Sequence, residues 1–212
     1  MLGGPVGRRE MPALNGTAGR TEMASSGEGN ILVLGLGNLL WADEGFGVRA
    51  VQMLHSQWCF SPRVNLVDGG TQGFNLLGII QSAQRLIVFD AIDYGLPPGS
   101  LKVLRNEQVP RFMGSKKLSL HQTGFQDVLG VAALTGGLPD ELVLIGVQPE
   151  SIDDYGGSLR PLVKAQLPPA LAIALDYLRA WGGVEQARHE ALAADDYLLP
   201  ASLDMLAYEA GR

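Results

Sequence analysis

Residues 31–49 read ILVLGLGNLLWADEGFGVR, and the rest of the predicted domain is arranged around this stretch. An apolar run at 31–34 leads into a glycine-rich turn at 35–38, and Asp43 and Glu44 follow where a helix is expected to begin. This pattern is typical of a buried strand that ends in a turn. A carboxylate at a helix start meets free N–H groups and stays ionised, available as a metal ligand or proton acceptor. From this stretch alone, either acid could equally be a helix cap.

The composition bounds the class of protein. The chain has 212 residues, of which 46% are hydrophobic and only 18% charged. These values predict one compact α/β domain with a well-buried sheet. The net charge of −6 argues against nucleic acid and against an anionic membrane surface as partners.

Cysteine usage and hydropathy indicate the compartment. The single cysteine, Cys59, excludes an intramolecular disulfide and fits a reducing environment. It ends a helical pattern with no histidine beside it, which argues against a nucleophile. No apolar run reaches the ~18 residues of a membrane span, and Arg8-Arg9 is not followed by the apolar segment of an export signal. We therefore expect a cytoplasmic protein.

The chain divides into three parts by composition. Residues 1–29 are rich in Gly, Ala, Ser and Glu without periodicity, which predicts a disordered extension; Met23 is an alternative start. Residues 30–182 carry the regular apolar patterns of a single α/β domain. Residues 183–212 are acidic and alanine-rich and are expected to form a peripheral tail, with a short helix at 201–210.

Strands and helices alternate in the first half of the domain. Apolar runs at 31–34, 64–67 and 86–89 predict strands, and the segments between them, 45–56 and 74–83, have helical spacing. Such alternation is typical of parallel βαβ units.

The second half departs from this alternation. The expected elements are a strand at 100–104, antiparallel because no helix precedes it, a helix at 122–134, a strand at 141–147 and a helix at 162–181. In the last helix Pro168-Pro169 marks either a kink or the true start. The predicted fold class is α/β: three layers, with a twisted, mostly parallel sheet of about five strands and helices on both faces.

Acidic residues follow each of the first three predicted strands. Glu44, Asp68 and Asp90 stand at these positions. Ligands of open parallel sheets bind beyond the carboxyl ends of the strands, and Glu44 and Asp90 would flank that crevice if the first and third strands are adjacent, which we assume. His121 precedes the predicted helix at 122–134 and adds an imidazole. Two carboxylates and an imidazole suit a divalent ion such as nickel or zinc, although a lone loop histidine is more often a surface residue.

Other site classes have weaker support. The Gly35-x-Gly37 pair lacks the third glycine of a dinucleotide fingerprint, since residue 40 is Leu. Asp68-Gly69-Gly70-Thr71 only resembles the aspartic-protease motif, and the elbow of serine hydrolases, the P-loop and the HExxH motif are absent.

Several motifs together resemble a known family, the nickel–iron hydrogenase maturation endopeptidases. They are GLGNLLWADEGFGVR (35–49), DGGTQG (68–73), FDAID (89–93), SLHQTG (119–124) and GVQPES (146–151). The similarity runs in register from about Ile31 to Trp181, and it is strongest to the branch that serves membrane-bound uptake hydrogenases.

The resemblance implies a cytoplasmic endopeptidase that removes a C-terminal extension from the hydrogenase large-subunit precursor after nickel insertion. In that family a glutamate, an aspartate and a histidine in these motifs bind metal, which matches Glu44, Asp90 and His121. The nickel would be supplied by the precursor and serve as the recognition element, and a divalent ion such as zinc could substitute. We expect the protein to be a monomer. Gly35 and Gly37 are expected to leave room for a loop of the substrate to approach the sheet edge.

Three questions stay open at this point. Asp43 or Asp68 could act as the catalytic base, or a bound metal could activate water directly, as in zinc peptidases. Asp43 could instead be a helix cap or a partner that positions a metal-binding residue. A non-cleaving nickel chaperone of hydrogenase assembly is an alternative function. A related peptidase of the same fold with another substrate is a further one.

Overall fold

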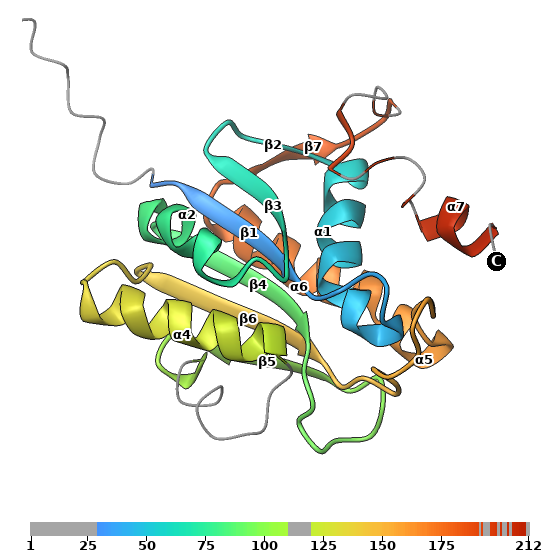
Figure 1. Ribbon diagram of the computed structural model, residues 1–212. Coiled ribbons are helices and arrows are strands. Elements are labelled where there is room, and N and C mark those ends of the chain that lie inside the picture. The colour runs from blue at the N-terminus through green and yellow to red at the C-terminus, as the bar shows by residue number, and fades with distance from the viewer. Residues whose placement is uncertain are drawn as a thin grey trace, which may run out of the picture.

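The computed structural model describes residues 29–109, 120–190, 192, 196–198, 200, 203 and 205–210. The expected disordered extension therefore lies outside the described residues, apart from Gly29. The described chain forms an α/β domain with a five-stranded sheet (Figure 1), as the composition predicted.

The strand order of the large sheet is β3-β1-β4-β6-β5. These strands are β1 (Ile31–Leu36), β3 (Val64–Gly70), β4 (Arg85–Ala91), β5 (Leu101–Arg105) and β6 (Glu141–Val147). β1 pairs in parallel with both β3 and β4, and β4 pairs in parallel with β6, whereas β5 runs antiparallel to β6. The assumed neighbourhood of the first and third predicted strands and the antiparallel strand near residue 100 are both confirmed.

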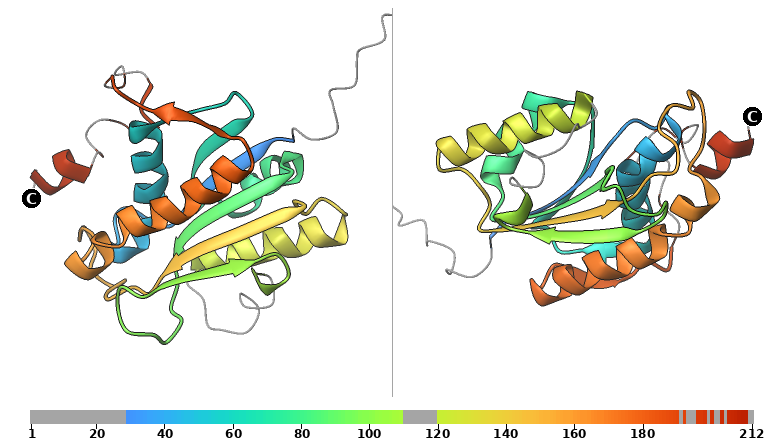
Figure 2. Two further views of the ribbon diagram at one scale, coloured as in Figure 1. Left: turned by 180° about the vertical axis from the view of Figure 1, so that it is seen from behind. Right: turned by 90° about the horizontal axis from the view of Figure 1, so that it is seen from below.

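Helices cover both faces of this sheet, and Figure 2 shows the sheet edge-on between them. On one face, α1 (Phe46–Gln57) and α6 (Leu167–Ala180) bury a cluster that includes Ile31, Val33 and Ile87. On the other, α2 (Leu77–Ser82) and α4 (Leu120–Leu134) bury a cluster that includes Leu32 and Leu34. Both faces of each inner strand are thus apolar, which explains why the strands read as continuous hydrophobic runs.

Two predicted helices are divided in the structure. The segment at 74–83 begins as a 3-10 turn, η2 (Gly73–Leu76), before α2. The expected helix at 162–181 is a short α5 (Pro161–Lys164) followed by α6, in which Pro168 and Pro169 occupy the first turn. The prolines mark the true start of α6, since N–H groups in a first turn have no intrahelical partner.

The sequence did not predict a second, two-stranded antiparallel sheet. It joins β2 (Trp58–Phe60), which contains Cys59, to β7 (Val184–Ala187). Part of the segment expected to be a peripheral tail is therefore paired with the domain. The helix expected at 201–210 is observed as α7 (Met205–Ala210), and the Tyr208 hydroxyl donates to the Gly156 carbonyl at 3.0 Å.

No helix within the described ranges has the length and apolar character that would let it cross a membrane.

Candidate active site at the carboxyl edge of the sheet

The glycines after β1 serve close packing of the chain on itself. Gly37 has φ +125°, and a Cβ there would lie 1.7 Å from the Glu44 carbonyl oxygen. A Cβ on Gly35 would lie 2.4 Å from the Gly47 carbonyl oxygen. The expectation that these glycines leave room for a substrate loop is wrong, because backbone of the η1–α1 segment already fills the space.

Asp43 lies in the 3-10 turn η1 (Ala42–Gly45), has no solvent exposure, and holds a distant loop. Its Oδ2 accepts the backbone N–H groups of Glu150 at 2.8 Å and Ser151 at 2.9 Å. Its Oδ1 accepts the N–H of Arg160 at 2.7 Å. Hydrogen bonds to an ionised acceptor are short and strong, so this carboxylate fixes both ends of the loop that follows β6. The sequence left three roles open for Asp43, a helix cap, a partner of a metal-binding residue or a base, and did not indicate that it holds this loop.

Glu44 and Asp90 come from neighbouring parts of the edge, because η1 packs against β4. Glu44 is partly exposed on η1, whereas Asp90, at the end of β4, has no solvent exposure. The adjacency of β1 and β4 thus brings these two predicted ligands to the same edge of the sheet. A metal ion that contacts Asp90 has to lie below the present surface.

Tyr94 stands over this part of the sheet. Asp90 is in register with Gly146, and a Cβ on Gly146 would lie 1.9 Å from the Tyr94 hydroxyl oxygen, so the glycine leaves the space that the hydroxyl fills. Burial, and then the negative charge of Asp90, raise the pKa of Tyr94. Tyr94 therefore stays a neutral phenol at physiological pH.

Gln148 supports the segment after β4. Its Oε1 accepts the N–H of Tyr94 at 2.7 Å and the N–H of Leu96 at 3.2 Å. Its Nε2 donates to Asp93 Oδ1 at 3.1 Å. This buried amide was missed in the sequence, where it is one residue within the GVQPES motif.

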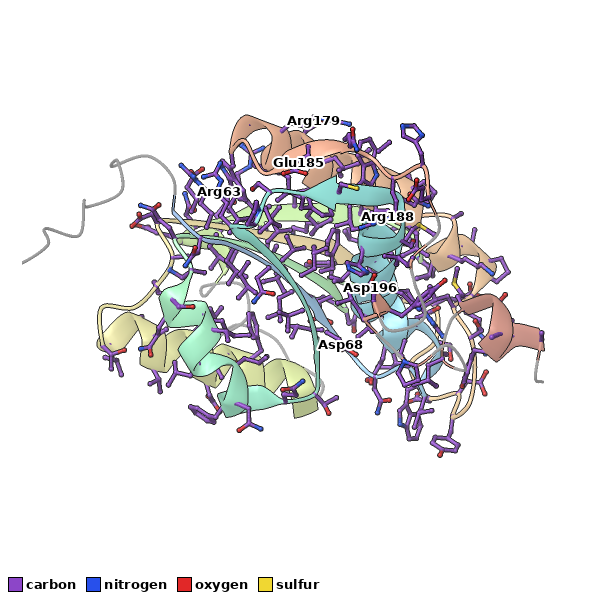
Figure 3. All side chains as sticks on the ribbon, turned by 90° about the horizontal axis from the view of Figure 1, so that it is seen from above. Arg63, Asp68, Arg179, Glu185, Arg188 and Asp196 are labelled. Atoms are coloured by element: carbon purple, nitrogen blue, oxygen red, sulfur yellow. The ribbon has the colours of Figure 1, made fainter. Side chains whose placement is uncertain are left out.

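Asp68 lies near the end of β3 (Figure 3). It is in register with Gly35 of β1. Its Oδ1 accepts the Gly70 N–H at 2.9 Å, and no described residue hydrogen-bonds to Oδ2. Burial raises the pKa of Asp68, and the hydrogen bond from Gly70 opposes this rise. A carboxylate with a raised pKa and a free oxygen is suited to accept a proton.

His121 is the second residue of α4, so the helix starts slightly earlier than the sequence predicted. The start of α4 packs near η2, since a Cβ on Gly124 would lie 3.6 Å from the Cα of Gly73. The backbone therefore brings His121 to the edge where β3 ends. Its side chain is outside the described part of the structure, so its joining Glu44 and Asp90 stays a prediction.

No group of three or more His, Cys, Asp or Glu suited to hold a metal ion occurs among the described side chains, a set that lacks the His121 imidazole. Two carboxylates and an imidazole would nevertheless fit a divalent ion by their chemistry. His55 is elsewhere, near the end of α1, where burial and the charge of Arg188 lower its pKa against an opposing effect of Asp196.

Comparisons with known proteins agree on one family. The profile described as "Hydrogenase maturation protease" matches residues 48–177. The chain is 60% identical over 183 residues to the hydrogenase expression/formation protein HupM of Azotobacter chroococcum, covering 86% of each. It is 56% identical over 182 residues to HupD of Thiocapsa roseopersicina, covering 86% of this chain and 82% of the relative.

Solved structures of similar proteins share the fold. The hydrogenase maturating endopeptidase HybD of Escherichia coli superposes with a TM-score of 0.71 at 41% identity, covering 75% of this chain and 98% of HybD. A maturation protease, also called HybD, of Thermococcus kodakarensis gives a TM-score of 0.58 at 30% identity, covering 70% of this chain and 98% of that one.

Proposed function

The chain belongs to the hydrogenase maturation protease family and is an endopeptidase, and on this premise we propose that it removes the C-terminal extension of a nickel–iron hydrogenase large-subunit precursor after nickel insertion. The nickel is part of the substrate, and cleavage takes place in the cytoplasm. One observation carries the proposal: Glu44, in η1 after β1, and Asp90, at the end of the adjacent strand β4, lie on the same edge of the sheet.

Glu44, Asp90 and His121 are the proposed contacts to the precursor's nickel. Carboxylates and imidazole are hard-to-borderline ligands that suit a divalent first-row metal, and three protein ligands leave positions for the precursor's own groups. Because nickel is then shared between both proteins, a precursor without it docks poorly. Docking also places the scissile peptide beside the edge, and such positioning lowers the barrier of a bimolecular reaction.

Asp68 is the proposed general base. Both oxygens of Asp43 already accept backbone N–H groups, which favours a positioning role for that residue. Asp68 Oδ2 has no such bond among the described residues, and burial raises the pKa of the carboxyl toward the working pH. Asp68 would take a proton from water as the water attacks the scissile carbonyl, and the proton would then pass to the departing amine.

The test uses purified protein with nickel-loaded and metal-free precursor, and mass spectrometry of the products. We expect loss of the C-terminal peptide from the nickel-loaded form only. Glu44→Gln and His121→Ala should abolish cleavage, while the matched carboxylate variant Asp140→Asn, at the opposite edge just before β6, should cleave normally.

Other results would decide against parts of the proposal. Equal cleavage of metal-free precursor would refute nickel as the recognition element. Cleavage that requires zinc bound to the isolated protease would favour direct activation of water by metal. Stable complex formation with no loss of peptide would indicate a nickel-handling chaperone.

A further inference from the structure

Exposed apolar side chains gather at the edge that carries Glu44. Within the described ranges, those that lie in the segments directly after the parallel strands β1, β3, β4 and β6 are Leu40, Phe74, Leu96 and Tyr155. The other large exposed apolar residues of these ranges are Leu134, at the end of α4, Leu162, in α5, and Tyr197. Water-exposed apolar surface of this kind, concentrated at one edge, marks a site of interaction with another molecule.

Leu40, Trp41 and Tyr155 are the best-defined part of this edge. Trp41 and Tyr155 form an isolated antiparallel β-bridge, and the Gly156 N–H donates to the Leu40 carbonyl at 2.6 Å. The two aromatic rings meet edge to face, with centroids 5.3 Å apart at 68°. Tyr155 is nevertheless 67% exposed and Leu40 41% exposed. Two loops thus present an apolar surface, which we call the aromatic platform.

Hydrogen bonds hold both loops of the aromatic platform. The Glu44 N–H donates to the Trp41 carbonyl at 2.9 Å, so the platform and the proposed nickel contact share one hydrogen-bonded turn. The loop of Tyr155 is held by the hydrogen bonds that the N–H groups of residues 150, 151 and 160 donate to Asp43. Side chains that are already ordered lose little conformational entropy on binding, and aromatic anchors of this kind dominate interface energetics.

The charge beside the platform is negative. Glu150 and Asp153 are exposed and form no ion pair with any other residue that the structure describes, whereas Asp154 pairs with Arg160 at 2.9 Å. The whole chain carries a net charge of −6. A partner segment that covers Tyr155 therefore gains from basic side chains.

We infer that the aromatic platform, Leu40, Trp41 and Tyr155, is the docking surface for an apolar and basic segment of the precursor, next to the nickel contact at Glu44. The inference rests on the proposed function, because a precursor whose nickel reaches Glu44 must cover the turn that begins at Trp41. Glu150 and Asp153 select for basic side chains in that segment. The platform thus adds a determinant of substrate choice that is independent of the metal.

The test measures cleavage rates against nickel-loaded precursor concentration, and the dissociation constant of the same pair by calorimetry. Tyr155→Ala should raise KM and Kd about 10-fold with little change in kcat, because it removes ground-state contact only. Tyr155→Phe should restore binding. Asp153→Lys should raise KM about 5-fold at low salt and less at high salt. The control is Leu134→Ala, which removes an 89% exposed leucine far from this edge and should change nothing.

Unchanged KM and Kd for Tyr155→Ala, or an equal change for Leu134→Ala, would overturn the inference. If Tyr155→Ala instead dissolves a dimer of the free protease in sedimentation experiments, the platform binds a second copy of this chain. If wild-type protein binds the precursor without cutting it, the proposed cleavage of this precursor fails, and the Kd of the variants alone still decides on the platform. Absence of both binding and cleavage would overturn both.

Discussion

The Asp43 carboxylate accepts a 2.7 Å hydrogen bond from the backbone N–H of Arg160, which follows it by 117 residues. With the bonds from Glu150 and Ser151, this contact ties the turn that carries Glu44 to the loop after β6. A buried carboxylate that serves several amides has a structural purpose that can be separated from any catalytic one. Loss of the Asp43 carboxylate should make the backbone N–H groups of the loop after β6 accessible to solvent, while the sheet stays intact.

Asp43→Ala should therefore lower the free energy of unfolding by about 3 kcal/mol, since three amides lose a charged acceptor. Hydrogen exchange at residues 150, 151 and 160 should accelerate well before exchange in β4 or β6. Asp153→Ala, which removes an exposed carboxylate from the same loop, is the control and should change neither quantity. Unaltered protection of the three amides in Asp43→Ala would contradict the assigned role.

Gly47→Ala should be among the most disruptive small substitutions in the chain. The added Cβ would lie 2.3 Å from the carbonyl oxygens of Leu36 and Phe89, so α1 would have to move away from β1 and β4. We expect a loss of at least about 2 kcal/mol in denaturant unfolding, as for other overpacked sites. Gly130→Ala, on an open face of α4, should stabilise by up to about 1 kcal/mol, because alanine is the better helix former. Equal effects of the two substitutions would refute the packing argument.

Asp68→Asn should reduce kcat by about 10²-fold or more if Asp68 is the general base. In the wild-type enzyme the acidic limb of the pH–rate profile should lie above the ordinary range of aspartate, because burial raises the pKa of Asp68. The asparagine variant should lose that limb. A mutant with wild-type kcat and an unchanged limb would eliminate Asp68 as the base.

Asp68→Asn should lower kcat but should not lower the stability of the folded protein. A pKa that is raised in the folded state gives a stabilising contribution below the unfolded pKa, which is lost as pH rises through the folded pKa. Asn mimics the neutral form, so Asp68→Asn should be as stable as wild type or more stable at pH 7. The advantage should vanish in acid, and thermal melts at both pH values measure it.

The pair of Lys164 and Glu209 should anchor α7 measurably but weakly. Lys164 Nζ contacts both Glu209 oxygens, at 2.8 and 2.7 Å, and the Ser158 hydroxyl donates to Oε1 at 2.7 Å. Because the pair is partly exposed, a double-mutant cycle with Lys164→Met and Glu209→Gln should give about 0.5–1 kcal/mol of coupling. The more exposed Arg179–Asp176 pair, at 3.4 Å, should give almost none. Coupling of the same size in both cycles would contradict this ranking.

Acid should weaken the Lys164–Glu209 pair. The hydrogen bond from Lys164, and then that from Ser158, lower the pKa of Glu209. A lowered folded pKa contributes stability above the unfolded value and loses it as pH falls through the folded one. The coupling energy should thus persist at pH 7 and disappear at low pH.

The sequence was a good guide wherever local pattern determined the structure. The apolar strands, their βαβ connections and the antiparallel β5 were all predicted, because burial on both faces imposes continuous apolar runs and a missing helix forbids a parallel crossover. The family resemblance was likewise contained in contiguous motifs.

Contacts between distant segments were not predictable in this way. Asp43 looked like a cap or a base because its partners, residues 150, 151 and 160, lie more than 100 residues away. The pairing of β2 with β7 also joins distant segments, and neither short strand has the alternating pattern that would predict a strand. The glycines at 35 and 37 suggested open space, although the segment that fills it follows a few residues later. Residue patterns thus predict which positions are buried better than they predict which segment packs against a glycine.

The position of β6 inside the sheet also governs the order in which the protein can assemble on the ribosome. β6 separates β4 from β5, so the earlier-made β5 has no neighbour to pair with until residues 141–147 emerge. At about 5–20 residues per second, Arg160 is made roughly 6–23 s after Asp43, which it follows by 117 positions. During that interval the Asp43 carboxylate has only water as a partner, and the turn of Glu44 lacks its contact with the loop after β6. The nascent chain thus contains Asp43 and Glu44 before the loop that Asp43 binds has been made. The carboxyl edge of the sheet, which carries the proposed active site, is therefore completed late in synthesis.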